Sequence, residues 1–146
     1  MRPELQEIVD EFAEAPKSLR LQILLDFANG LPPLPDDLDR GGMEQVHECQ
    51  TPFFVTAPVD ETGHVTLHFD APPEAPTTRG YAGVLREGLS GATVDEVLET
   101  PPDFFTGMGL SELISPLRLR GMGAILARIK RLVVEQTGGS DGAPVT

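Results

Sequence analysis

The stretch FFVTAPVDETGHVTLHF (residues 53–69) contains two runs in which apolar residues alternate with others. The alternating apolar residues are Phe53, Val55, Ala57 and Val59 in the first run, and Val65, Leu67 and Phe69 in the second. A period of two predicts strands with one buried face. Asp60–Gly63, between the runs, has the composition of a short hairpin loop. A shorter strand is expected over residues 43–47, which completes a small antiparallel three-stranded sheet.

The rest of the chain has the spacing of helices that cover one face of this sheet. Helices are expected from Pro3, from about Pro16 to Asn29, from Thr78 to Glu87, after Thr93 and after Ser115-Pro116. Thr93 and Glu96 form a capping box, and a serine before proline is a typical helix start. The fold class is therefore α+β, with residues 1–136 as a single domain and residues 137–146 as a disordered tail.

Two of these helices carry further patterns. In the second helix, one apolar stripe is expected, formed by Leu21, Leu24, Leu25 and Ala28. In the long helix after Ser115 lie five of the chain's 11 basic residues, namely Arg118, Arg120, Arg128, Lys130 and Arg131. Cations late in a helix interact favourably with its dipole, and this interaction accounts for the three basic residues from Arg128 to Arg131.

Composition excludes several classes of protein. The 146 residues carry a formal net charge of −12, which repels nucleic-acid phosphates and anionic lipids, so neither nucleic acid nor membrane is an expected partner. A single cysteine cannot form an internal disulfide and favours a reducing compartment. The charged N-terminal residues contain no apolar run typical of a signal peptide. We therefore predict a cytoplasmic protein.

Cys49 is the first candidate for chemistry. A lone cysteine is more often a small buried apolar residue than a reactive one. Here, however, its neighbours Glu44, His47 and Glu48 are polar, and Pro52 marks the start of the following strand. We therefore expect Cys49 at the tip of an exposed turn, where its thiol can meet the thiol of a partner.

The histidines offer a second candidate. His47 and Cys49, with His64 and His68 on a neighbouring strand, are the ligand types of a zinc or iron site. His64 and His68 fall on the polar face of their strand, however, where histidine is ordinary. No nucleophile elbow, P-loop or dinucleotide fingerprint is present. We therefore predict neither a metal nor a cofactor.

Several motifs, in order and spacing, resemble those of the SufE family of sulfur-acceptor proteins, from about Leu5 to Val134. They are LPPLP (residues 31–35), VHECQTPFF (46–54), TTRGYAGVL (77–85) and the long segment from GATVDEVL to LARIK (91–130). The family's cysteine motif, V-x-G-C-Q-S-x-V-W, is matched at Val46, Cys49 and Gln50, with Thr51 close to the serine and Phe54 at the tryptophan position. The family's L-[ST]-P-x-R-x-x-G motif is matched by residues 114–121.

This resemblance implies a fold like that of the SufE and IscU scaffolds. It also implies a task, in which a pyridoxal-phosphate-dependent cysteine desulfurase holds sulfur as a persulfide and the SufE-like partner accepts that sulfur on Cys49. The sulfur then passes to an iron–sulfur scaffold protein. Such a chain is a sulfur carrier and desulfurase activator more than an independent enzyme.

The resemblance further implies a set of site residues: Cys49, Arg118, Glu74 and His47. Arg118 would hold a sulfur anion or the desulfurase surface, and Glu74 takes the place of the family's acidic residue. Glu48 stands where the family has glycine, so it is expected to stiffen the loop and to raise the pKa of the thiol. A protonated His47 would offset that charge.

Two other functions remain open at this point. The chain could be a docking or regulatory module that binds a desulfurase without carrying sulfur, and Glu48 is the residue that favours this alternative. It could also be an apo-scaffold that holds a metal through Cys49 and a histidine.

Overall fold

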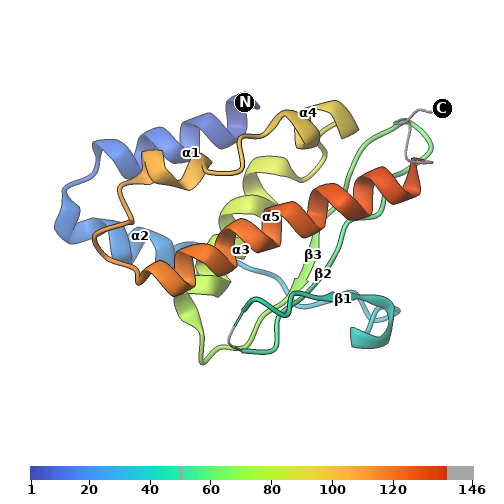
Figure 1. Cartoon of the computed structure of the whole chain (residues 1–146), viewed down its shortest axis with the longest axis horizontal. Helices are drawn as coiled ribbons and strands as arrows, with labels where there is room; N and C mark the ends of the chain where they lie inside the picture. The colour runs from blue at the N-terminus through green and yellow to red at the C-terminus, as the bar shows by residue number, and fades with distance from the viewer. Residues whose placement is uncertain (50, 138–146) are drawn as a thin grey trace.

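The computed structural model describes residues 1–49 and 51–137. Within these ranges it confirms the predicted α+β class, with a small sheet packed by helices (Figure 1). The elements in chain order are α1 (Pro3–Glu14), α2 (Lys17–Asn29), η1 (Arg40–Gly42), β1 (Glu44–Gln45), β2 (Phe54–Thr56), β3 (His68–Asp70), α3 (Pro76–Leu89), α4 (Val94–Glu99), η2 (Phe104–Met108) and α5 (Pro116–Gln136). The tail expected to be disordered lies outside the described residues, apart from Thr137.

The sheet is antiparallel with strand order β1-β2-β3, as the alternation predicts. Val55 pairs with Phe69, and both side chains are buried on the predicted face. The strands are shorter than the apolar runs because Pro58 has no N–H to donate to a ladder. Beyond Pro58 the hairpin continues only as an isolated bridge between Val59 and Val65.

The long helix α5 packs against β2 and crosses the sheet (Figure 1). Its buried residues recur at helical spacing and include Met122, Ile125, Leu126, Ile129 and Val133. Both predicted helix starts are confirmed: the Ser115 hydroxyl accepts a hydrogen bond from the Arg118 N–H, and Thr93 and Glu96 form a capping box. No helix in the described ranges is both long enough and apolar enough to cross a membrane.

The helices α2 and α3 approach each other closely through glycines that carry no side chain. Gly80 lies against Leu24, and Gly83 lies against the backbone of Phe27. The predicted stripe of α2 is wrong at Leu21, which is 39% exposed. Leu21 lies about one turn before Leu24, the residue that faces Gly80. Because α3 begins at Pro76, also about one turn before Gly80, little of α3 lies opposite Leu21.

The short helix η2, which the sequence pattern did not predict, closes the core over Tyr81. The Tyr81 ring stacks on Phe104 at a centroid distance of 5.8 Å and meets Phe105 edge-on at 6.2 Å. Tyr81 is fully buried, and its hydroxyl has no hydrogen-bond partner among the described residues. Burial without a partner also raises the pKa of Tyr81.

Replacing Tyr81 with phenylalanine is therefore expected to raise the free energy of unfolding by about 1 kcal/mol, because a desolvated hydroxyl is removed and no hydrogen bond is lost. Urea denaturation followed by circular dichroism measures the change. Thr100→Val is the matched control, because the buried Thr100 hydroxyl donates to the Glu96 carbonyl at 2.9 Å, and its loss should destabilise. A Tyr81→Phe variant that unfolds at lower urea than the wild type would show that the hydroxyl has a partner.

Candidate functional site: a cavity beside Cys49

Three segments that are distant in sequence meet on the lower side of the molecule as drawn in Figure 1: the loop between β1 and β2, the start of α3 and the start of α5. They enclose a cavity of about 70 Å³. Its lining residues are Glu48, Cys49, Thr51, Glu74, Ala75, Thr78, Leu117, Arg118 and Gly121. Three of the four site residues expected from the sequence, Cys49, Glu74 and Arg118, thus line one cavity, whereas His47 does not.

Cys49 is half-buried, and the expectation of an exposed turn tip is wrong. Its loop folds back onto α5, and the sulfur lies 3.6 Å from the point where a Cβ atom on Gly121 would stand. A side chain larger than alanine at position 121 would occupy the space beside the thiol. The glycine in the second family-like motif therefore provides the surface on which Cys49 rests.

This environment keeps the thiol protonated. Burial, together with the nearby charge of Glu48, raises the pKa of the Cys49 thiol to about 11. The direction predicted from Glu48 is confirmed, but burial is the larger cause and was not predicted. Because the thiolate is the nucleophile, Cys49 in this closed arrangement is a weak one at neutral pH.

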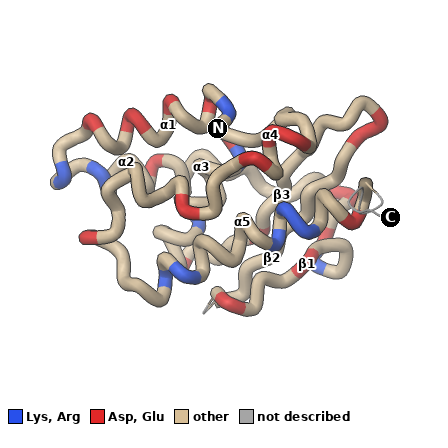
Figure 2. Tube along the Cα trace, turned by 45° about the horizontal axis from the view of Figure 1, so that its top comes forward, with Lys and Arg blue, Asp and Glu red and all other residues tan. Residues whose placement is uncertain are grey.

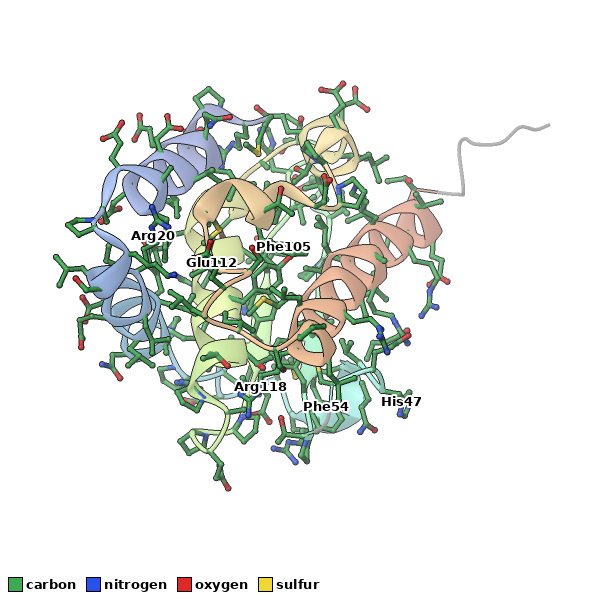
Figure 3. All side chains as sticks on the ribbon, turned by 60° about the vertical axis from the view of Figure 1, so that its left-hand side comes forward. Arg20, His47, Phe54, Phe105, Glu112 and Arg118 are labelled. Carbon is green, nitrogen blue, oxygen red and sulfur yellow. The ribbon has the colours of Figure 1, made fainter. Side chains whose placement is uncertain are left out.

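The exposed Arg118 side chain reaches from α5 to the first turn of α3. Its Nη1 donates to the Thr77 hydroxyl at 2.9 Å, which ties the first turns of α5 and α3 together. Figure 3 shows Arg118 on the first turns of α5. The N-terminal ends of two helices, 14 and 21 residues long, reach this cavity, and helix N-termini carry partial positive charge. Two carboxylates that also line the cavity, those of Glu48 and Glu74, oppose these positive groups, and the raised pKa of Cys49 indicates that the free cavity disfavours an anion on its sulfur.

The histidines lie elsewhere. His47 is exposed and is drawn at the outer edge of the molecule in Figure 3, so the structure gives no geometric support to its expected role. The His64 ring shares a hydrogen bond with the Thr62 hydroxyl in the hairpin, 2.8 Å between Nδ1 and Oγ1. Within residues 1–49 and 51–137, no three His, Cys, Asp or Glu side chains are grouped so as to hold a metal ion.

An ion-pair cluster beside the cavity was missed at the sequence level. The Glu48 carboxylate lies 3.0 Å from Nη2 of Arg128, and Glu44 pairs with both Arg128 and Arg131. The explanation of these arginines by the helix dipole is wrong, because α5 continues to Gln136 and they precede its last turn. The feature of the sequence that could have indicated this cluster is spacing. Arg128 follows Gly121 by seven residues, or two helical turns, and so lies on the same face of α5 as Gly121.

The fold and the cavity together define a small α+β protein whose one cysteine rests, half-buried, between the starts of two helices. The family described as the Fe-S metabolism associated domain, SufE, matches residues 6–133. The chain therefore belongs to the SufE family.

Comparisons with individual proteins give relatives named as SufE or SufE-like and a similar solved structure. An uncharacterized SufE-like protein of Mycobacterium tuberculosis is 51% identical over 131 residues, which cover 90% of this chain and 92% of that protein. A cysteine desulfuration protein SufE of Plasmodium vivax is 26% identical over 89% of this chain and 52% of its own length. A solution structure of a hypothetical protein from Thermus thermophilus superposes with a TM-score of 0.84 at 46% identity, covering 94% of this chain and 98% of that one.

Proposed function

We propose that this chain accepts sulfur from a pyridoxal-phosphate-dependent cysteine desulfurase as a persulfide on Cys49, and passes it to a scaffold protein of iron–sulfur cluster assembly. The observation that carries the proposal is the position of Cys49, the only cysteine, on the wall of a cavity that Arg118 and Glu74 also line. Relatives named cysteine desulfuration protein SufE support it. A lone cysteine suits the reducing cytoplasm as the setting.

The proposed transfer needs only one thiol on this chain. The Cys49 thiolate attacks the terminal sulfur of the desulfurase persulfide, a new S–S bond forms as the old one breaks, and the desulfurase cysteine leaves as a thiolate. No electrons pass to a third molecule. The proton of the Cys49 thiol goes to water or to Glu74. With no second cysteine in the chain to resolve the product, the persulfide persists until an acceptor arrives.

The cavity suits this product in size. Its volume of about 70 Å³ leaves room beside the sulfur for one more atom of that size, since a water molecule needs only about 10–15 Å³ on a comparable measure. A persulfide anion there would interact favourably with Arg118 and with the positive ends of α3 and α5, and unfavourably with Glu48 and Glu74, which line the same cavity.

One observation favours the alternative of a docking module that carries no sulfur. The thiol is half-buried and its pKa is raised to about 11, so little thiolate forms at neutral pH. A carrier must therefore open its loop when it docks, whereas a docking module needs no reactive thiol. The metal-holding alternative finds no such support, because none of the three histidines lines the cavity.

Incubation with a cysteine desulfurase and free cysteine, followed by mass spectrometry of the intact chain, tests the proposal. Cys49 is expected to gain one or more sulfur atoms that reductant removes, and only when both reactants are present. Cys49→Ser should bind the desulfurase but should not stimulate its turnover. If the wild type stays unmodified while an established acceptor is loaded in parallel, sulfur acceptance is wrong and the docking module takes its place.

A further inference from the structure

The guanidinium of Arg128 connects the Cys49 loop to α5. Nη2 of Arg128 lies 3.0 Å from Oε1 of Glu48, the residue directly before Cys49. Nη1 of the same side chain donates to the Glu44 carboxylate at 2.9 Å and to the Gln45 carbonyl at 3.3 Å. Arg128 therefore holds both β1 and the loop that follows it, and Figure 2 shows the basic residues of this part of α5 close to β1 and β2.

The two partners differ in exposure. The Arg128 side chain is only 16% exposed, whereas the Glu48 side chain is 49% exposed. The cation is thus anchored by its other contacts, and the carboxylate remains within reach of solvent or of a partner. Half-exposed ion pairs are weakly held, so this contact can open without unfolding of the helix.

We propose that the Arg128–Glu48 pair is a latch that keeps the Cys49 loop closed against Gly121, and that its release exposes the thiol. Arg128 is then a positioning residue for Cys49, acting through Glu48. The use of the latch in sulfur transfer rests on the proposed function, but the latch itself is a property of the free protein.

A simpler role for Arg128 would be to neutralise Glu48 without holding the loop. The charged groups that face the thiol are Glu48 from its own loop, Glu74 from the segment before α3, and Arg118 from α5. If Arg128 only neutralises, its removal leaves Glu48 uncompensated, raises the pKa of the thiol further and slows its alkylation. If it is a latch, its removal relieves the burial that dominates the shift, lowers the pKa and accelerates alkylation.

Alkylation of the free full-length protein by iodoacetamide, followed by mass spectrometry from neutral to about pH 11, separates the two roles. Arg128→Gln should react about three- to fivefold faster at neutral pH, the size expected when one half-exposed ion pair is lost, with the midpoint of its pH profile moved toward the roughly 8.5 of an exposed thiol. Glu48→Asp keeps the charge but shortens the reach, so it should also react faster. Arg131→Gln is the matched control, because Arg131 pairs with Glu44 and Glu135 rather than Glu48, and its rate should stay within about twofold of the wild type.

Slower or unchanged alkylation in folded Arg128→Gln would overturn the latch. If that variant does not fold, Glu48→Asp decides alone, and a rate no faster than the wild type rejects the proposal. No desulfurase is present in these measurements. A failure of the latch therefore leaves sulfur acceptance open, and a failure of sulfur acceptance leaves the latch result intact.

Discussion

Replacing Gly83 with alanine is expected to lower the free energy of unfolding by about 3 kcal/mol, a large part of the stability of a small domain. A Cβ atom at position 83 would stand 2.4 Å from the carbonyl oxygen of Phe27 and 2.9 Å from the carbonyl carbon of the same residue. These are backbone atoms of α2, so the clash is relieved only if the two helices move apart. Alanine favours a helix over glycine by about 1 kcal/mol, which is too little to offset that movement.

Urea denaturation measures this change, and Gly123→Ala is the matched control. Gly123 lies within α5, and a Cβ atom there meets nothing within 4 Å. The same chemical change should therefore stabilise the protein by up to about 1 kcal/mol at position 123. If both substitutions stabilise, the close approach of α2 and α3 at Gly83 is wrong.

The alkylation rate of Cys49 in the wild-type protein is expected to rise with pH to a midpoint of about 11. At neutral pH the folded protein should react roughly two orders of magnitude more slowly than the urea-unfolded chain, whose thiol titrates near 8.5. Rates of iodoacetamide labelling with and without urea, corrected for the effect of urea on a free thiol, test this. A native midpoint near 8.5 would mean that the loop is open in solution.

The raised pKa of Cys49 also determines how the free energy of unfolding changes with pH. Since the folded state holds the thiol proton more tightly, it binds more protons than the unfolded state between about pH 8.5 and pH 11. The contribution of Cys49 to the free energy of unfolding is therefore complete below this window and falls as pH rises through it. Subtracting the pH profile of Cys49→Ser removes the contributions of other groups, such as Tyr81, that titrate at high pH.

Local patterns were sufficient to predict most of the secondary structure. The alternation in residues 53–69 predicts the hairpin and its buried face because side chains in a strand alternate strictly between two sides. Thr93 with Glu96, and Ser115 before Pro116, predict helix starts because their hydrogen bonds lie within three residues of the cap. The motif around Cys49 likewise singles out the thiol as the candidate for chemistry.

What the tertiary structure alone decided depends on contacts between distant segments. The polar neighbours of Cys49 predict an exposed thiol, but Gly121 on α5 provides a surface against which the loop closes. Glu48 looks like an unfavourable replacement for glycine until Arg128, 80 residues away, is seen to pair with it. Burial and ion pairing are set by which surfaces meet when the helices pack on the sheet, and the residues on either side of Cys49 carry no information about that meeting.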